Sequence, residues 1–415
     1  MRLLYFALDS PLPANNGLRL RTWTILRALH AEGARIELIC LAPVPLGEFD
    51  GVRAVCDEFW TAGHRGASLS RGRDYYGRMR ALGSRQPYSA RRFRSPAASA
   101  LLRELCARNH HDAVICDTVF PAGNLPPELP PLVLNHHNIE HRIFESYARQ
   151  QGWSWRRAAV SWEGQRVARW EATVGRRTAL NLVCSEVDRC VLLEQQPEAN
   201  IAVVPNIAPQ SAVPDVNTEE DPDLVVFQGA LDWLPNRDAV DWFLADVWPA
   251  VLARCPSVRF QVVGRNPPED FLARHRGRAR VEFTGTVTDV RPYLGRAAVA
   301  IAPMRIGSGT RLKILEAAGM AKAVVATPLG AQGLHFVPGV EIELADSSIE
   351  FAALLLQLLR SPERRQMLGA AAQTRVRTEY SFGALRQSLR RALSTLDGCG
   401  TTAPGLTVAF HGART

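Results

Sequence analysis

The stretch 302-APMRIGSGTRLKILEAAGMAKAVVATPLGAQGL-334 decides how we interpret this sequence. A short apolar strand, VAIAP (299–303), runs into a glycine-rich loop, and a helix follows from about Thr310. A second apolar strand, AVVAT (323–327), comes directly after that helix. Short apolar strands that alternate with helices predict a parallel sheet with both faces covered.

The same alternation runs through both halves of the chain. In the first half we predict strands over 3–8, 35–43, 112–117, 132–138, 181–186 and 201–206, and helices over 17–33 and 153–178. In the second half we predict strands over 223–229, 258–264, 280–285, 299–303, 323–327 and 341–344, and helices over 237–253, from about 310, over 348–359 and over 362–396. The fold class is therefore α/β, with two Rossmann-like, doubly wound domains facing a cleft.

The domain boundaries follow from composition. The predicted parts are an N-terminal, acceptor-binding domain (1–207), a linker (208–222), a C-terminal, donor-binding domain (223–375), a helix that can cross back to the N-terminal domain (376–397) and a tail (398–415). The linker is rich in Pro, Asp and Glu and has no periodicity, and the tail carries turn formers without a pattern.

Length and composition limit the class of protein. A chain of 415 residues with 47% apolar residues is too long for one core and is typical of about two globular domains. Its apolar runs are shorter than the ~18 residues of a membrane span. The run from Leu3 to Leu8 is a first strand rather than a signal peptide. Eight scattered cysteines, with no CxxC, favour reduced thiols and a cytoplasmic protein.

The positive charge is concentrated in one segment. The chain has a net charge of +8, and between Arg65 and Arg108 eleven arginines face only Asp74 and Glu104, a local balance of +9. Such a face can meet nucleic acid, anionic lipid or a phosphorylated substrate, or it can simply be solvated. The segment 153–177 adds tryptophans and arginines along one predicted helix. That helix can lie on a membrane surface or pack its tryptophans inside the N-terminal domain.

The loop before the helix near Thr310 carries the features of an anion site. Gly307 and Gly309 let the backbone approach a ligand closely, and Ser308 or Thr310 can cap the helix. The free N–H groups of the first turn then point at the cleft, where the helix dipole favours an anion. A glycine loop before a helix is also common without any ligand.

Two cations stand in the first turn of this helix. Arg311 and Lys313 lie at the end of a helix that disfavours positive charge, unless an anion lies among them. A diphosphate would resolve that conflict, although both side chains can also be solvated. Glu316 lies about one and a half turns further on, where a carboxylate can accept two hydrogen bonds from a vicinal diol such as ribose.

These stretches resemble a known family. The runs GTVTDVRPYL (285–294) and 302–334 look like the donor half of family-four glycosyltransferases, the bacterial group-1 glycosyl transferases, which are retaining enzymes of the GT-B architecture. The looser matches are VVFQGALDWLPN (225–236), VVGRNP (262–267), LPANNGLRLRTWTILRAL (12–29) and NHHNIEHRIF (135–144). The resemblance covers roughly residues 1–395.

The resemblance implies roles for the donor-side residues. Glu316 matches the second glutamate of the family's Glu-x7-Glu signature, which holds the donor ribose, whereas the first glutamate is replaced by Ser308. Arg311 and Lys313 would face the diphosphate. After the first donor-domain strand the family often has an arginine and a lysine, but the sequence GALDWLPNR offers only Arg237. The implied nucleotide-sugar contacts are Gly17, Gly229, Arg237, Gly307, Ser308, Gly309 and Thr310.

The resemblance also implies roles on the acceptor side. Gly17 matches the loop glycine that lets the backbone approach the donor phosphate, and a histidine of the segment HHNIEH would lie beside the reacting sugar. His137, followed by Asn138, fits that position better than His136. The implied catalytic residues are His137, Glu316, Arg311 and Lys313.

Two patterns bear on metals, and neither predicts a site. The imidazoles and the carboxylate of HHNIEH (136–141) could ligate zinc, but their spacing matches no familiar metal motif. Asp221 and Asp223 form a DPD that resembles a metal-binding Asp-x-Asp, yet it precedes a strand instead of following one. We expect no metal and no cofactor beyond a nucleoside-diphosphate sugar as co-substrate.

The sequence thus predicts a metal-independent, retaining glycosyltransferase in the cytoplasm. Its partners would be a nucleotide-sugar donor, a saccharide or lipid-linked acceptor of cell-surface polysaccharide or glycolipid synthesis, and an anionic membrane at the inner face, without nucleic acid. The alternatives are a sugar-nucleotide epimerase of the same architecture and a non-catalytic anion-binding or nucleic-acid-binding protein.

Overall fold

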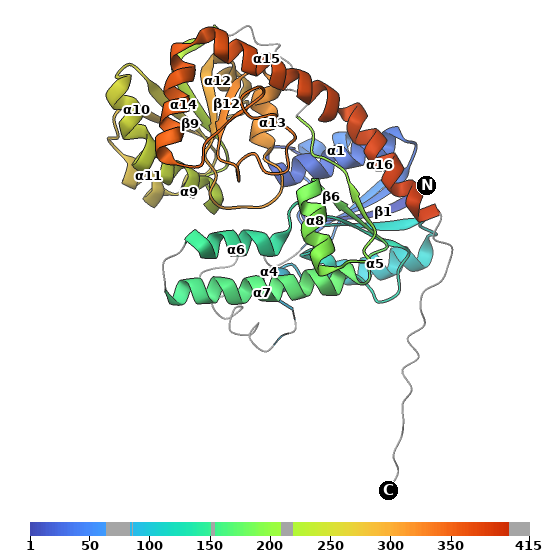
Figure 1. The fold of residues 1–415 in the computed structure, drawn as a ribbon. Coiled ribbons are helices and arrows are strands. Elements are labelled where there is room, and N and C mark those ends of the chain that lie inside the picture. The colour runs from blue at the N-terminus through green and yellow to red at the C-terminus, as the bar shows by residue number, and fades with distance from the viewer. Residues whose placement is uncertain (64–83, 85, 151–153, 209–218, 398–415) are drawn as a thin grey trace.

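The computed structural model describes residues 1–63, 84, 86–150, 154–208 and 219–397 of the chain. Figure 1 shows two lobes, each with a central sheet flanked by helices. The first lobe holds the N-terminal half together with the last helix, and the second lobe holds the remainder. The predicted pair of Rossmann-like domains is confirmed.

The N-terminal domain is built on a seven-stranded sheet whose pairings are all parallel, in the order β3-β2-β1-β4-β5-β6-β7. Its strands are β1 (Arg2–Ala7), β2 (Arg35–Cys40), β3 (Glu58–Thr61), β4 (Ala113–Asp117), β5 (Leu132–Asn135), β6 (Leu180–Val183) and β7 (Ile201–Val203). Alternate residues of β1 enter different cores, with Leu3 and Tyr5 on one face and Leu4 and Phe6 on the other. The near-continuous apolar strands of the sequence therefore reflect a sheet buried on both faces.

The C-terminal domain repeats this plan with a six-stranded parallel sheet in the order β10-β9-β8-β11-β12-β13. Its strands are β8 (Asp221–Gln228), β9 (Arg259–Val263), β10 (Val281–Gly285), β11 (Ala297–Ala302), β12 (Ala323–Ala326) and β13 (Glu343–Leu344). Phe227 of β8 and Val299 of β11 lie in one core, whereas Val226 and Ala300 lie in the other. Both sheets reverse their strand order beside the first strand, which is where ligands bind in such folds.

Helices cover both faces of each sheet (Figure 1). In the N-terminal domain they are α1 (Gly17–Ala31), η1 (Leu46–Glu48), α2 (Phe49–Arg53), α4 (Tyr88–Arg91), α5 (Pro96–Arg108), η3 (Pro121–Asn124), α6 (Glu140–Gln150), α7 (Trp155–Gly175) and α8 (Glu186–Gln195). In the remainder they are α9 (Leu234–Trp242), the π-helical η5 (Phe243–Val247), α10 (Trp248–Arg254), α11 (Glu269–His275), α12 (Arg291–Arg296), α13 (Leu312–Gly319), α14 (Ser348–Arg360), α15 (Pro362–Glu379) and α16 (Phe382–Asp397).

Two boundaries differ from the sequence-based expectation. Strand β8 begins at Asp221, inside the range predicted as linker, because the DPD run pairs with the neighbouring strands. The rest of that linker is described only at 208 and 219–220, and the predicted tail (398–415) lies outside the described residues. The helix predicted over 362–396 is two helices, because Tyr380 leaves the helix and Ser381 Oγ accepts a hydrogen bond from the N–H of Ala384.

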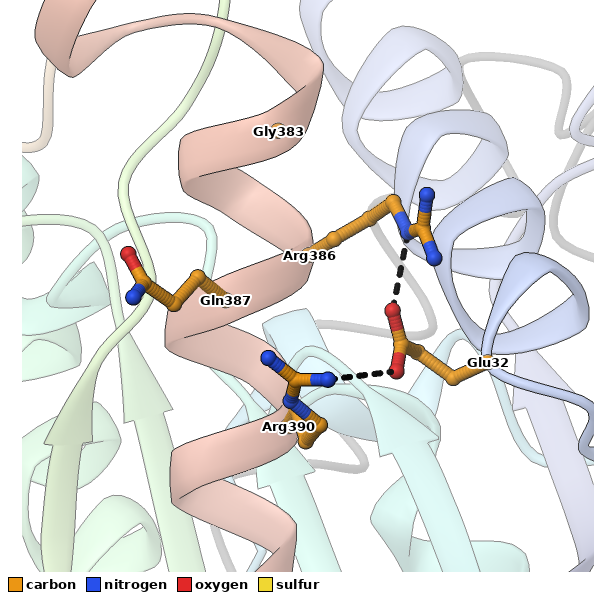
Figure 2. Close-up of a pocket in the computed structure, with 5 residues that line it drawn as sticks. All are labelled: Glu32, Gly383, Arg386, Gln387 and Arg390. Atoms are coloured by element: carbon orange, nitrogen blue, oxygen red, sulfur yellow. Dashed lines mark hydrogen bonds and ion pairs between the residues drawn. The ribbon is translucent and has the colours of Figure 1, made fainter.

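The last helix belongs to the N-terminal core. Leu385 and Leu389 of α16 are buried in the same cluster as strand β1 and helix α1. At the surface, Glu32 at the end of α1 binds Arg386 at 2.8 Å and Arg390 at 3.8 Å, and the three side chains line a shallow pocket (Figure 2). The chain therefore crosses between the lobes a second time, just before α16.

Candidate functional site

The two domains meet where the strands of each sheet end. The loop between β11 and α13 lies against the N-terminal domain: Ser308 Oγ accepts from the N–H of Ile139 (3.2 Å), and the N–H of Gly307 donates to Ser146 Oγ (2.9 Å). Gly17, the first residue of α1, faces Leu312, the first residue of α13, at 3.3 Å from a Cβ built on Gly17. The structure thus brings the starts of two helices, one from each domain, to one place.

The hydroxyls of the glycine-rich loop do not cap α13, contrary to the expectation for Ser308 and Thr310. The N-cap is Arg311, which makes no side-chain cap hydrogen bond. Ser308 is instead bonded to the N-terminal domain, and Thr310 Oγ1 accepts from Asn206 Nδ2 at 2.7 Å. The helix begins later than predicted, so both hydroxyls are directed across the interface between the domains.

The two glycines of the loop make room for protein atoms. A Cβ on Gly307 would lie 2.5 Å from the guanidinium of Arg311, and a Cβ on Gly309 would lie 2.8 Å from the carbonyl oxygen of His137. Gly309 also has a φ of +73°, in the left-handed region that favours glycine. These glycines therefore allow a tight turn packed against His137 and Asn138, whereas the sequence suggested a close approach to a ligand.

Arg311 lies inside the loop. Its Nη1 donates to the carbonyl oxygens of Ser308 and, at 2.8 Å, of Gly309. Burial lowers the pKa of Arg311 to about 10, and Asp188 of the N-terminal domain partly offsets that effect. Nε and Nη2 are buried without a hydrogen-bond partner in the structure. In this arrangement the guanidinium holds the loop in shape and does not extend from the first turn of α13.

Lys313 extends toward the end of strand β8. Its Nζ donates to Asn236 Oδ1 at 2.7 Å and lies 4.1 Å from the centre of the Phe227 ring. A Cβ on Gly229 would approach this nitrogen to 3.0 Å, so the structure brings Lys313 and Gly229 together. Burial lowers the pKa of Lys313 well below its ordinary value, and the charge of Arg311 lowers it further.

Glu316 lies one helical turn further along α13. Gln228, the last residue of β8, donates from Nε2 to Glu316 Oε2 at 3.0 Å and to the carbonyl oxygen of Lys313 at 3.2 Å. Burial raises the pKa of Glu316 to about 7, and the charge of Asp289 acts in the same direction. The carboxylate and the ammonium group therefore lie on successive turns of one helix, beside the end of β8.

Arg237 was predicted as a nucleotide-sugar contact. It lies on α9, after β8, and its Nη1 donates to the carbonyl oxygen of Leu231 at 2.8 Å. The structure therefore uses it to fold the loop that follows β8. Asn236, its neighbour, is the residue that reaches Lys313, and the sequence analysis did not single it out. A polar residue directly after Trp-Leu-Pro gives no signal of its own.

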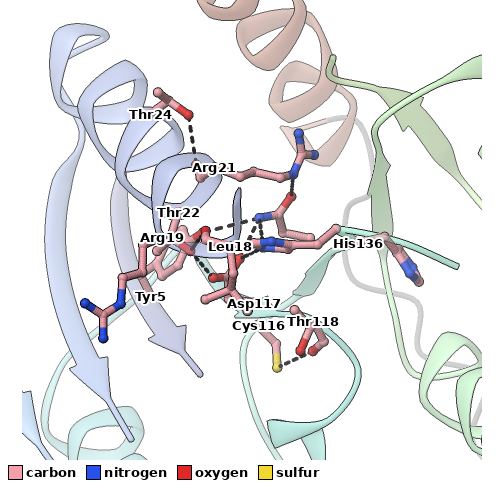
Figure 3. A network of polar contacts seen from close by, with 12 residues as sticks. Tyr5, Leu18, Arg19, Arg21, Thr22, Thr24, Cys116, Asp117, Thr118 and His136 are labelled. Atoms are coloured by element: carbon pink, nitrogen blue, oxygen red, sulfur yellow. Dashed lines mark hydrogen bonds and ion pairs between the residues drawn. The ribbon is translucent and has the colours of Figure 1, made fainter. Parts of the chain in front are cut away.

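The N-terminal side of the site contains a buried polar network (Figure 3). Asp117, at the end of β4, accepts from Tyr5 Oη (3.0 Å), Thr22 Oγ1 and Asn135 Nδ2 (2.6 Å), and it pairs with His137 Nε2 at 2.7 Å. Burial raises the pKa of Asp117, but the charge and the hydrogen bond of His137 outweigh burial, so the pKa is lowered overall. Asp117 thereby fixes the orientation of the His137 ring.

A chain of hydrogen bonds connects this network to the loop between β11 and α13 (303–311), which we call the donor loop after its predicted role. Arg21 donates from Nε to Asn135 Oδ1 (3.1 Å) and from Nη1 to Asn206 Oδ1 (3.0 Å), and Asn206 donates to Thr310. Of these residues only Thr310 was predicted as a site residue; the others were missed because they lie in segments predicted only as strands and helices. Asn206 was placed at the end of a predicted strand.

The three histidines of HHNIEH go to three different partners. His136 binds Asn181 Oδ1 at 3.0 Å and points away from the network in Figure 3. His141 binds Glu171 Oε2 at 2.7 Å, while His137 binds Asp117. Within the described residues no group of three or more His, Cys, Asp or Glu side chains could hold a metal ion.

The DPD run lies far from the ends where the strands meet the interface. Asp221 opens β8 at the amino end of the strand, where Arg259 binds it and Arg296 lies 3.8 Å away. Ligands in parallel sheets bind at the carboxyl ends, so this position does not suit a donor site. The structure therefore assigns the Asp221 carboxylate to ion pairs at the amino end of the strand.

Lys313, Glu316 and Gly229 lie within a stretch that matches a known protein family. Residues 222–361 match the family described as Glycosyl transferases group 1. The C-terminal half of the chain thus carries a group 1 glycosyltransferase domain. The protein is accordingly a glycosyltransferase. No curated protein sequence matches the chain.

Solved structures similar to this glycosyltransferase share its fold over nearly the full length. Sucrose-phosphate synthase from Thermosynechococcus elongatus has a TM-score of 0.70 at 14% identity, covering 96% of this chain and 100% of its own. Anabaena HepE in complex with UDP-glucose has a TM-score of 0.61 at 14% identity, with coverage of 95% and 100%. A variant of S. aureus TarM, in complex with UDP and α-GlcNAc-glycerol among other ligands, has a TM-score of 0.68 at 10% identity, with coverage of 94% and 99%.

Proposed function

We propose that this glycosyltransferase moves a sugar from a nucleoside-diphosphate sugar to a saccharide or lipid-linked acceptor, with retention of anomeric configuration and without a metal, in the cytoplasm. The product would belong to a cell-surface polysaccharide or glycolipid. The observation that carries the proposal is the placement of Lys313 and Glu316 on successive turns of α13, beside Gly229 and Asn236 and opposite the start of α1.

The donor would bind along the start of α13. Glu316 suits the ribose hydroxyls, because an ionised carboxylate can accept two hydrogen bonds from a vicinal diol. Lys313 suits the diphosphate, because a partly desolvated ammonium group with only neutral partners gains from an anion. Arg311 is then a positioning residue, since its guanidinium holds the carbonyl oxygens of the loop beside Lys313.

The chemistry needs stabilisation of a leaving group more than it needs a protein nucleophile. The bond from the anomeric carbon to the diphosphate oxygen breaks, and the acceptor hydroxyl forms its new bond on the same face of the sugar. Its proton passes to the departing phosphate oxygen. Lys313 and the N–H groups that open α13 would stabilise the negative charge that develops on the diphosphate. His137, held by Asp117, would assist at the reacting sugar.

The acceptor side of the proposal has separate support. The N-terminal domain forms the opposite wall with the Asp117–His137 pair and Gly17. Neighbours of the same fold were solved with UDP-glucose and with α-GlcNAc-glycerol, which are a sugar donor and a glycoside. The arginines between Arg65 and Arg108 suit an acidic acceptor, although 64–83 and 85 lie outside the described residues.

A panel of nucleotide sugars tests the proposal. We expect one or a few to raise the melting temperature, and the same donor to be consumed only when an acceptor glycoside is added. Activity should survive EDTA, and NMR of the product should show the anomer of the donor. Conversion of the donor alone into an isomeric nucleotide sugar would favour an epimerase. Loss of activity in EDTA that manganese restores would contradict metal independence, and steep, salt-dependent binding of nucleic acid with no donor binding would reject the transferase.

A further inference from the structure

The first half of helix α7 exposes an apolar stripe. Trp155 is 76% exposed and Trp162 is 43% exposed, and Ala158 and Ala159 between them are exposed as well. The four positions follow the spacing i, i+3, i+4 and i+7, so they lie on one face of the helix. In Figure 1 this helix lies along the outer edge of the first lobe, beneath α6. Two tryptophans rarely remain exposed on one helix face without a partner.

The exposed charged side chains of α7 have one sign. Arg156 and Arg169 of α7 are exposed, and Arg156 lies over the ring of Trp155. The two acids of the helix are turned inward. Glu163 accepts from the N–H and the hydroxyl of Ser89, and Glu171 is 2% exposed and binds His141.

The neighbouring segment adds further cations. Ser89 belongs to α4, which packs against α7, and the exposed Arg94 follows shortly after it. The backbone of 84 and 86 also accepts hydrogen bonds from Arg166 of α7. The described part of the basic segment (84 and 86–108) and the tryptophan-bearing helix therefore lie side by side.

We propose that this surface of α7 docks the protein on an anionic lipid bilayer. Tryptophan rings favour the interface between headgroups and acyl chains, and each arginine near an anionic membrane adds electrostatic attraction. A helix that lies in the interface needs an apolar stripe flanked by cations, which is the composition of this face. No helix in the described part of the chain is long and apolar enough to cross a membrane, so the contact would be peripheral.

The docking surface is connected to the donor loop. Helix α7 packs along α6, and at their closest approach a Cβ on Gly164 would lie 2.8 Å from Phe144 Cβ. Helix α6 in turn contacts the loop before α13 through Ser146, which binds Gly307. A bilayer bound to α7 would therefore lie a fixed two-helix layer away from the site, on the acceptor side.

Vesicle sedimentation of the full chain tests the inference without any nucleotide sugar, so it can fail independently of the proposed transferase. We expect binding to vesicles of equal parts phosphatidylcholine and phosphatidylglycerol, and little binding to phosphatidylcholine alone. Trp155→Ser with Trp162→Ser should weaken the partition coefficient at least tenfold, and Arg156→Gln with Arg169→Gln should weaken it on anionic vesicles only. Ile349→Ser is the matched control, because Ile349 is 83% exposed on α14 of the other lobe.

Three results would overturn the assignment. The first is an absence of anionic-vesicle binding by the unaltered protein. The second is equal binding by the double tryptophan variant and the control. The third is a change from dimer to monomer in the tryptophan variant with vesicle binding unchanged, which would make the stripe an interface between two copies of the chain. Circular dichroism checks that each variant is folded.

Discussion

Lys313 is a half-buried cation whose partners are an amide oxygen, a thioether and an aromatic ring. No carboxylate of the described residues pairs with it within salt-bridge distance. Such a charge costs stability in the free protein and gains when an anion arrives. We expect Lys313→Met to leave the melting temperature of the free protein unchanged or higher, and to weaken UDP binding by about 30-fold or more, since a charge-assisted hydrogen bond is worth about 2 kcal/mol.

Lys322 provides the matched control for that substitution. It is the other lysine of the chain, and it binds Glu220 at 3.3 Å at the far end of α13. Lys322→Met should bind UDP as the unaltered protein does in calorimetry. Equal loss of affinity in the two variants would show that lost folding, and not a lost ligand contact, explains the effect.

The raised pKa of Glu316 predicts that the stability of the free protein depends on pH. Its pKa is raised to about 7 in the folded protein, from an ordinary value of 4.5. A raised pKa means that its contribution to stability is complete below the unfolded pKa and is lost as the pH rises through about 7. Glu316→Gln should therefore make the free protein more stable than the unaltered protein at pH 8, and equally stable at pH 4 to 5. Melting curves over this range provide the measurement.

Ionisation of Glu316, which lowers the stability of the free protein, should raise its affinity for the donor. If the ionised form accepts the ribose hydroxyls, affinity for the nucleotide sugar should rise between pH 6 and pH 8. Glu316→Gln should bind about tenfold more weakly at pH 8, with a flat profile. Affinity that rises with pH equally in both proteins would mean that another group is responsible.

The sequence identified some residues of the site and missed others for physical reasons. Lys313 and Glu316 could be found because their spacing on one helix is a local property. Asp117 and Asn135 could not, because they become neighbours only when β4 and β5 pair. Arg311 was predicted to face a ligand, but its guanidinium donates to carbonyl oxygens of its own loop, within three residues. The local sequence cannot distinguish a ligand contact from this contact within the loop.

The α6–α7 hairpin is one of the elements through which the N-terminal domain contacts the loop before α13. Gly164→Leu should destabilise the protein by about 1–3 kcal/mol, because its side chain would have to displace Phe144 and separate the helices. Gly47→Ala, at a glycine with nothing within 4 Å of a built Cβ, is the control and should change little. Denaturant unfolding measures both, and equal values for the two variants would show that the close approach at Gly164 carries no energy.

Most strands could be predicted from the sequence, whereas several helices could not. Among the described residues, every strand except β3 was predicted within a few residues of its ends, because these strands are apolar and bounded by turns. Helix α6 was missed because its start, HHNIEH, was interpreted as the polar end of a strand, whereas Glu171 binds the N–H groups of Glu140 and His141 from a distant helix. A cap supplied from far along the chain leaves no local pattern.

The N-terminal domain needs α16, from the far end of the chain, to complete its core. Because Leu385 and Leu389 complete the core of the N-terminal domain, Leu389→Asp should destabilise that domain first. Hydrogen exchange should show faster exchange in β1, β2 and α1, while β8, β9 and α14 remain protected. Glu32→Gln, which removes only the surface pairing with Arg386 and Arg390, should cost no more than about 1 kcal/mol. Faster exchange confined to the C-terminal sheet would contradict this assignment of α16.

The return of α16 has a consequence for how the protein is made. During translation, β1 to β7 are synthesised long before residues 382–397. The face of the first sheet beside α1 therefore stays exposed to solvent until the second lobe and α16 have been synthesised. During that interval the nascent chain exposes an apolar surface that chaperones can recognise. The N-terminal half expressed alone should for the same reason be poorly soluble, and a peptide of the α16 sequence supplied in trans should rescue it.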